Sequence, residues 1–279
     1  MGRYDKIRVW NGSSWVQPSR MYVWNGSSWV DFGTNDSSNT RTLYVWNGSS
    51  WVRKTLNRKT NTVTQDKYLQ YNGGAGTSLP DGYQFYNAKY EFIVQPDAQG
   101  NYMMFETAVS NEACYARLGF WNNGSKYYVY GKSRYNSGTA YESSTAGSGT
   151  LAAGVKYKIT YVTGSNKVTV YNYSTGATWT GTNSYAGLFY QWPCSASMFN
   201  GCVSGTSGRN LYGKVWYAYV QGCKNSSTTN NATYNLNSST AGSSTLTVTS
   251  QSSAGGVAAG NRTHYGTIID PSYTYYTWE

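Results

Sequence analysis

The sequence predicts an all-β protein, and three observations lead to this fold class. Aromatic residues make up 17% of the 279 residues while charged residues make up only 12%. The 29 Tyr and 11 Trp favour strands, and the 31 Gly, together with many Ser, Thr and Asn, favour tight turns between short strands. No long segment repeats apolar residues at the spacing of an amphipathic helix.

Residues 1–54 contain three copies of one short motif. The segment Val-Trp-Asn-Gly-Ser-Ser-Trp-Val occupies positions 9–16, 23–30 and 45–52. Each copy predicts a β-hairpin, because Asn-Gly adopts the positive φ angles of a tight turn and the flanking Trp rings can contact each other across the strands. A lone hairpin is only marginally stable in water, so we expect a stalk or docking element that packs on other hairpins, another chain or a larger assembly. The residues expected to make these contacts are Trp10, Trp15, Trp24, Trp29, Trp46 and Trp51.

A linker and then the main set of strands are expected after the repeats. Residues 55–66 are rich in Thr, Asn, Lys and Arg, and we interpret them as a linker. In residues 67–223 apolar and polar residues alternate, as strands of a two-sheet sandwich require. A short turn at 164–166 is expected to join two of them. The clearest predicted strands are 83–85, 88–94, 102–109, 113–121, 126–130, 156–163, 167–173 and 211–220.

The order of three segments in this region resembles a known fold family. Positions 90–94 are Tyr-Glu-Phe-Ile-Val, positions 120–129 are Phe-Trp-Asn-Asn-Gly-Ser-Lys-Tyr-Tyr-Val, and positions 154–161 are Gly-Val-Lys-Tyr-Lys-Ile-Thr-Tyr. With the strands that follow, this order resembles the concanavalin A-like (laminin-G-type) jelly rolls over roughly residues 67–223. The N-terminal units similarly resemble hairpin repeats of bacteriophage structural proteins. Together the two resemblances imply a phage fibre- or decoration-type structural protein with a lectin-like domain.

Residues 224–279 are rich in Ser, Thr and Asn. Only 244–249, 265–269 and 273–278 have strand-like sequences, and there are too few apolar residues for an independent core. This segment could add strands to the sandwich, form a small β tip or pair with sister chains. We favour a β-rich appendage that is docked or oligomeric.

Several classes of partner and cofactor are not expected. The net charge is +10, but the basic residues are scattered and form one compact run at 53–59, so nucleic-acid binding is not predicted. No stretch is long and apolar enough for membrane insertion. The four cysteines match no zinc or Cys-x-x-Cys pattern, which leaves open a Cys194–Cys202 disulfide or free thiols. No loop is dense in Asp and Asn, so no metal or other cofactor is expected.

The sequence also gives no sign of a catalytic site. No two acidic residues of residues 67–223 are spaced two apart on a strand, although Glu91 and Glu106 could meet across strands. A hydrolase triad would have to use His264, which is the only His and lies apart from any nucleophile elbow. No phosphate-binding loop is present. We therefore expect a protein that is not an enzyme.

Sugar binding remains as a function that the loops could support. Sugars are held by flat aromatic faces surrounded by amide and hydroxyl groups, although Tyr and Trp rings also serve as core or interchain packing. The glycan-binding candidates are Trp121, Asn122, Tyr135, Tyr141, Trp179, Tyr185 and Trp192.

The expected function is that of a phage virion surface protein of the fibre type. It would bind other virion proteins and bacterial surface glycans and would form a homo-oligomer, with a trimer favoured. The N-terminus has no secretory signal, which fits a particle released by lysis. One alternative is a purely structural capsid-decorating or fibre protein without sugar binding. The other is a polysaccharide depolymerase.

Overall fold

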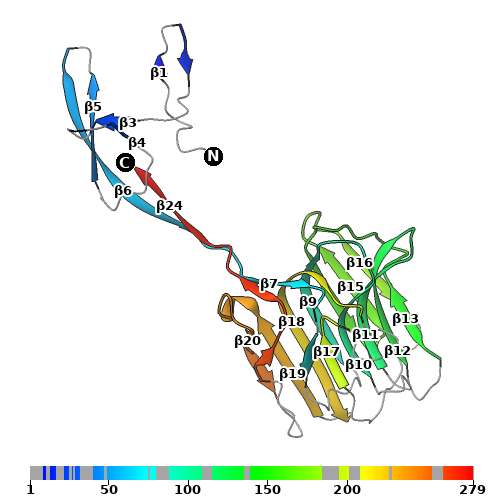
Figure 1. The fold of residues 1–279 in the computed structure, drawn as a ribbon. Coiled ribbons are helices and arrows are strands. Elements are labelled where there is room, and N and C mark those ends of the chain that lie inside the picture. Colours follow the sequence, from blue (N-terminus) through cyan, green and yellow to red (C-terminus); the bar gives the residue numbers. More distant parts are fainter. Residues whose placement is uncertain are drawn as a thin grey trace. The chain divides into compact units, whose positions relative to one another are not determined.

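The all-β fold class is confirmed by the computed structural model. It describes residues 9–10, 13–16, 22–24, 27, 29–31, 40–46, 49–74, 76–79, 88–108, 115–134, 139–183, 195–200, 208–225, 228–252 and 260–278. These residues form antiparallel strands and one short 3-10 helix, η1 (Leu236–Ser238). No helix in these ranges is long and apolar enough to cross a membrane. The chain divides into unit 1, Met1–Val63 with Tyr273–Glu279, and unit 2, Thr64–Ser272 (Figure 1).

The three sequence repeats form three antiparallel hairpins of unit 1, as predicted. Their strands are β1 (Val9–Trp10) with β2 (Trp15–Val16), β3 (Tyr22–Trp24) with β4 (Trp29–Asp31), and β5 (Thr40–Trp46) with β6 (Trp51–Val63). In every hairpin the first Trp of the motif lies directly opposite the second. Because four residues separate the paired Trp, the connection is longer than the two-residue turn that Asn-Gly favours.

The linker predicted at residues 55–66 is wrong for most of its length. Strand β6 runs on to Val63 and pairs with β5 through Asn57, then with β24 (Tyr273–Trp278) from Arg58 onward. The Asn61 amide also donates to the Thr277 hydroxyl oxygen at 2.9 Å. Backbone hydrogen bonds from two successive partners keep this polar segment extended, which composition alone does not reveal.

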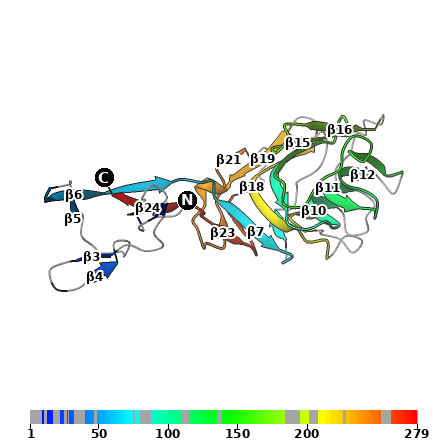
Figure 2. The ribbon, with the colours of Figure 1, turned by 90° about the horizontal axis from the view of Figure 1, so that it is seen from above.

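Unit 2 contains two large antiparallel sheets (Figures 1 and 2). The six-stranded sheet has the order β13-β12-β11-β10-β17-β8. Its strands are β8 (Thr77–Leu79), β10 (Tyr102–Ala108), β11 (Tyr115–Asn122), β12 (Tyr127–Arg134), β13 (Tyr141–Ser144) and β17 (Ser195–Met198).

The nine-stranded sheet has the order β16-β15-β14-β9-β18-β19-β21, with β7 paired to β18 and to β23. Its strands are β7 (Tyr68–Asn72), β9 (Lys89–Pro96), β14 (Tyr157–Val162), β15 (Lys167–Asn172), β16 (Thr178–Thr182), β18 (Tyr212–Asn225), β19 (Thr228–Asn235), β21 (Ser250–Ser252) and β23 (Thr267–Ile269). A separate pair is formed by β20 (Thr245–Leu246) and β22 (Arg262–Thr263).

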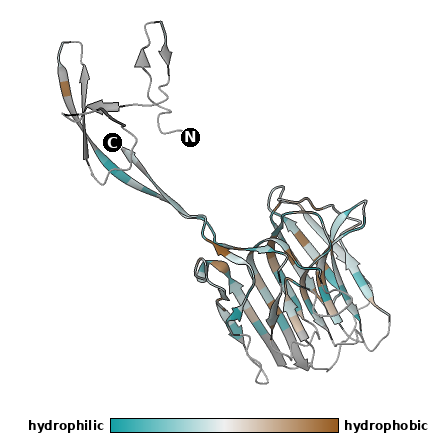
Figure 3. Ribbon diagram, in the orientation of Figure 1, coloured by the Kyte–Doolittle hydropathy of each residue, from teal (hydrophilic) through white to brown (hydrophobic). Residues whose placement is uncertain are grey.

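One hydrophobic core lies between the two sheets. Strand β9 alternates half-buried and buried positions along its whole length, and its inward residues include Tyr90 and Phe92. The Tyr90 ring stacks on Phe105 of the opposite sheet with centroids 4.1 Å apart. Figure 3 shows hydrophobic positions on the strands of both sheets of unit 2. The predicted strand segments at 88–94, 156–163 and 167–173 are confirmed, whereas residues 83–85 lie outside the described residues.

The favoured prediction of a docked appendage at 224–279 is wrong, and the alternative that this segment adds strands to the sandwich is confirmed. Strands β19, β21 and β23 extend the nine-stranded sheet, and β24 belongs to unit 1. The few apolar side chains of this segment enter the shared core, so the segment needs no core of its own. These residues are Ala232, Tyr234, Leu236, Leu246 and Ile268.

The edges of the two sheets meet where β13 lies beside β16. The side-chain amide of Asn183 donates to the backbone carbonyl of Glu142 at 3.0 Å. The Ser148 hydroxyl donates to the backbone carbonyl of Thr180 at 3.3 Å. A Cβ on Gly181 would lie 2.0 Å from the Ser144 carbonyl oxygen. Only glycine permits this close approach of the two backbones.

Gly181→Ala is expected to lower the free energy of unfolding by about 1–3 kcal/mol, because the added methyl group must push the two sheet edges apart. Urea unfolding followed by circular dichroism measures the change. Gly147→Ala is the matched control, since a Cβ there meets no atom within 4 Å. Equal stability of the two variants would contradict this account of the sheet edge.

The buried tyrosines predict a loss of stability at alkaline pH. Burial raises the pKa of Tyr127 and Tyr161 above 10.0, and it raises the pKa of Tyr130 to about 12. Because the unfolded chain ionises its phenols first, stability is complete below pH 10 and is lost as the pH rises toward 12 and beyond. Phenolate absorbance and circular dichroism, recorded together in an alkaline titration, should change in one cooperative step. Ionisation of these phenols without unfolding would contradict the prediction.

Candidate functional site

A continuous row of polar side chains crosses the outer face of the six-stranded sheet. Successive strand pairings place Ser197 beside Glu106, Glu106 beside Arg117, Arg117 beside Lys132, and Lys132 beside Glu142. Since directly paired residues point to the same side of a sheet, all five side chains lie on one face. The opposite face of these strands contributes to the core.

The centre of the polar row is a buried ion pair. The Arg117 Nε donates to the Glu106 carboxylate in a short contact, and the Glu106 side chain has no exposed surface. The Arg117 guanidinium also lies 3.9 Å from the centre of the Tyr115 ring. Because a carboxylate is costly to bury without a counter-charge, Glu106 depends on Arg117.

The far end of the row is open to solvent. Lys132 Nζ lies 3.5 Å from the Glu142 carboxylate, and their side chains are 34% and 40% exposed. The Glu106–Arg117 pair lies beside this exposed pair in the same row. An exposed pair of this kind contributes little to stability.

An aromatic cluster borders the polar row. The Trp121 ring meets the Tyr130 ring edge-on with centroids 5.8 Å apart, and the Arg209 guanidinium lies 4.9 Å from the centre of the Trp121 ring. Met103 and Tyr128 complete the cluster. Trp121 remains only partly buried, so its ring and the Arg209 donors are presented together.

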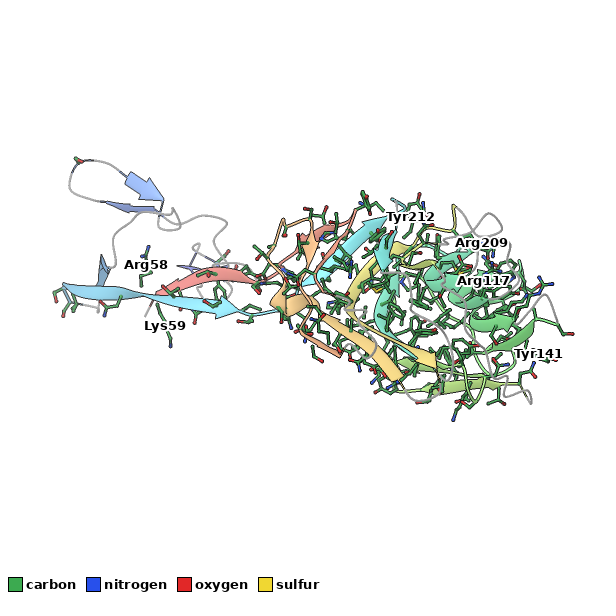
Figure 4. The ribbon with its side chains drawn as sticks, turned by 90° about the horizontal axis from the view of Figure 1, so that it is seen from below. Arg58, Lys59, Arg117, Tyr141, Arg209 and Tyr212 are labelled. Atoms are coloured by element: carbon green, nitrogen blue, oxygen red, sulfur yellow. The ribbon has the colours of Figure 1, made fainter. Side chains whose placement is uncertain are left out.

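Arg209 reaches the cluster from the segment before β18. The Met103 amide donates to the Arg209 carbonyl at 2.9 Å, which fixes the backbone of this segment beside β10. Figure 4 labels Arg209 and Arg117, which come from this segment and from β11. The Tyr130 hydroxyl donates to the Met103 sulfur at 3.6 Å. Burial raises the pKa of Tyr130 more than the positive charges of Arg209 and Arg117 lower it, so the phenol is a neutral part of the cluster.

Of the predicted glycan-binding residues, Trp121 lies on this outer face. The Asn122 carboxamide oxygen accepts from the Gly124 amide at 2.9 Å and thus holds the turn after β11. Tyr141 pairs with Ser133, and this register places it on the inner side of the sheet. The Trp179 ring packs against Tyr157, with centroids 6.2 Å apart, and borders the core.

The other predicted contact residues are not placed by the structure. Tyr135, Tyr185 and Trp192 lie outside the described residues. The side chains of the six repeat Trp residues are likewise not described, although their backbones pair as predicted. Cys114, Cys194 and Cys202 fall outside the described ranges, so the proposed Cys194–Cys202 disulfide stays a prediction.

Sequence reasoning missed most residues of this face. The run Tyr127-Tyr128-Val129-Tyr130 carries aromatic residues at consecutive positions, and this could have indicated a strand with rings on both sides. Arg209 has no such local signal. Only the tertiary fold brings it to Trp121.

The expectation that Glu91 and Glu106 could meet across strands is wrong. Glu91 lies on β9 of the other sheet, where Lys89 and Lys158 pair with its carboxylate at 3.2 and 3.1 Å. Glu106 and Glu142 share one face but are three strand spacings apart, roughly 14 Å. Carboxylate pairs of glycosidases lie within about 10 Å of each other.

His264 and the acidic residues give no further reactive centre in the described part of the chain. The His264 side chain is 3% exposed, and burial lowers its pKa. No group of three or more His, Cys, Asp and Glu side chains in the described ranges is arranged to hold a metal ion.

Comparisons with known proteins find distant structural similarities. No protein-family model matches the chain, and no curated protein matches it. A heptameric SAP-like pentraxin from Limulus polyphemus is similar at 12% identity and a TM-score of 0.37, over 57% of this chain and 76% of the pentraxin. An inferred carbohydrate-binding protein from Bacteroides ovatus is similar at 14% identity and a TM-score of 0.41, over 82% of this chain and 65% of that protein.

The solved structures also include tailspike protein 2 of a bacteriophage of Escherichia coli O157:H7. Its identity is 11% and its TM-score is 0.39, over 58% of this chain and 26% of the tailspike. The chain thus matches about a quarter of the tailspike's length.

Glu106→Gln is expected to destabilise unit 2 by about 3–5 kcal/mol, because it leaves the buried Arg117 charge without its counter-ion. Glu142→Gln removes the same charge from the exposed pair of the row and should cost less than about 1 kcal/mol. Urea unfolding of the two variants measures the difference. A similar small effect of both substitutions would show that the buried pair does not hold this face together.

Proposed function

We propose that unit 2 is a non-catalytic glycan-binding module that recognises bacterial surface sugars through the outer face of its six-stranded sheet. The observation that carries this proposal is the partly exposed Trp121 ring, which contacts Tyr130 and Arg209 beside the polar row. A pyranose ring has one apolar C–H face, which stacks on an aromatic ring. Its hydroxyl groups would then meet the Arg209 donors.

The rigidity of this face supports a binding role. Trp121 and Tyr130 stand on paired central strands of the sheet, and Arg209 is held through its own backbone. Side chains that are already ordered lose little conformational entropy when a ligand binds. A loop-borne Trp would lack this advantage.

The proposal that the module does not cleave its glycan rests on the placement of its carboxylates. Glu106 is buried and neutralised by Arg117, and Glu142 is too distant to act with it as an acid and nucleophile pair. A polysaccharide depolymerase is therefore the less favoured alternative.

We place this module on the surface of a phage particle, as part of a fibre-type protein. The three Trp-paired hairpins support this part of the proposal, because near-identical repeats favour a structural or docking role over chemistry. A homo-oligomer, with a trimer favoured, belongs to the same proposal. A purely structural fibre or capsid-decorating protein is the alternative, and the pairing of β24 with the third repeat hairpin favours it.

Trp121→Ala is expected to reduce binding of the full chain to host cells and their purified surface polysaccharide about tenfold or more, since a central Trp commonly dominates such contacts. Arg209→Gln should weaken binding in the same assay. Tyr265→Ala is the matched control, because Tyr265 is a 63% exposed ring outside this face. Binding that is absent from the unchanged protein, or equal in all variants, would favour the purely structural role.

The same polysaccharide tests the enzymatic alternative. Incubation with the unchanged protein should release no reducing ends. Release that disappears in Glu142→Gln would establish a depolymerase and overturn the non-catalytic part of the proposal. Glu142 is the better probe because its exposed ion pair can be removed without unfolding the sheet.

A further inference from the structure

A second ordered surface lies on the outer face of the nine-stranded sheet. Six side chains there form a continuous line of contacts across β15, the segment before β14, β18 and β7. We call it the ammonium–aromatic row, and in order of contact it consists of Tyr171, Tyr173, Lys156, Trp216, Tyr68 and Lys214. The strands that carry it are labelled in Figure 1.

Each ammonium group of the row is held against aromatic rings. Lys156 Nζ lies 4.2 Å from the centre of the Trp216 ring and 5.4 Å from that of Tyr173. Lys214 Nζ lies 5.1 Å from the centre of the Tyr68 ring. The Tyr68 and Trp216 rings contact each other at 5.6 Å, which joins the two lysine sites. Cation–π contacts of this kind hold flexible lysine chains in place before any ligand arrives.

Part of the row is open to solvent. Tyr171 and Tyr173 are 37% and 44% exposed and meet edge-on at 5.1 Å. Their rings stand beside Lys156, because the Tyr173 amide donates to the Lys156 carbonyl at 3.1 Å. The partly exposed Tyr173 ring therefore lies next to the Lys156 ammonium group.

The charge of this face is predominantly positive. Among the described side chains, the lysines of this face are Lys89, Lys156, Lys158, Lys167 and Lys214. The carboxylate among them is Glu91, which is already paired with Lys89 and Lys158. Asp66 interacts electrostatically with Lys156, and Asp97 accepts from the Gln70 amide at 2.6 Å. A surplus of positive charge therefore remains along the row.

We propose that the ammonium–aromatic row binds an acidic polysaccharide, a linear glycan whose sugars bear carboxylate groups. Such a polymer matches both features of the row. Its carboxylates pair with Lys156 and Lys214, and the apolar face of an adjoining sugar stacks on Tyr171 or Tyr173. A polyanion without such faces would use only the lysines. This site is on the opposite sheet from Trp121 and does not depend on it.

The test is calorimetric titration of the full chain with polygalacturonate oligosaccharides and with the same oligosaccharides as methyl esters. We expect the acid to bind at least roughly tenfold more tightly than the ester, because esterification removes the negative charges and leaves the sugar rings in place. The double variant Lys156→Gln/Lys214→Gln should lose about tenfold in affinity. The double variant Tyr171→Ser/Tyr173→Ser should also weaken binding, although it leaves the net charge unchanged.

The matched control is Arg58→Gln/Lys59→Gln, which removes two charges from β6 of unit 1. An equal loss in this control would show that only net charge matters and would overturn the proposal. Equal binding of the acid and the ester would also overturn the proposal. Binding of oligothymidylate that depends on the same lysines would overturn it as well and would indicate a nucleic-acid site. Trp121→Ala should leave polygalacturonate binding unchanged, so failure here and failure of the Trp121 site are distinguishable.

Discussion

Unit 2 depends on tyrosine as its main large core residue, and tyrosine cannot be buried like leucine. The rings fill the space between the sheets, but every hydroxyl needs a polar partner. The Tyr161 hydroxyl donates to the Asn166 side chain at 3.0 Å, and the Tyr157 hydroxyl accepts from the Ala152 amide at 2.8 Å. Tyr234 donates to the Gly260 carbonyl at 3.1 Å. The core thereby fixes the turns at the rim as well as the sheets.

This constraint occupies polar groups at the rim of the sandwich. Rim residues such as Asn166 are engaged by core hydroxyls, and Asn166 itself adopts a positive φ of 43° in its turn. The outer faces of the two sheets lie away from these core hydroxyl groups. They differ from each other in chemistry. One carries Trp121 and Arg209 on the same face as the Glu106–Arg117 ion pair, and the other carries lysines in contact with aromatic rings.

The sequence predicted the parts of the fold that depend on local pattern. Alternation along β9, β14 and β15 gave their positions, and the Trp-Asn-Gly-Ser-Ser-Trp motif gave the hairpins. It could not predict that residues 58–63 continue strand β6, because they pair with β24 at the other end of the chain. It also could not separate Glu91 from Glu106, since the assignment of strands to sheets is a tertiary property. The sequence predicts Trp121 as a site residue. It does not predict its partner Arg209, because the contact between them depends on the tertiary fold.

The pairing of β6 with β24 has a consequence for the modularity of the chain. Val63 and Tyr273 lie opposite each other, and the Gln65 amide donates to the Ser272 hydroxyl oxygen at 3.0 Å. The two ends of unit 2 are therefore neighbours, and in sequence the unit is an insertion between two partners of one ladder. Domains with adjacent ends tolerate transplantation and circular permutation. A recombination event could exchange this sandwich for another and leave the hairpin unit with its ladder complete.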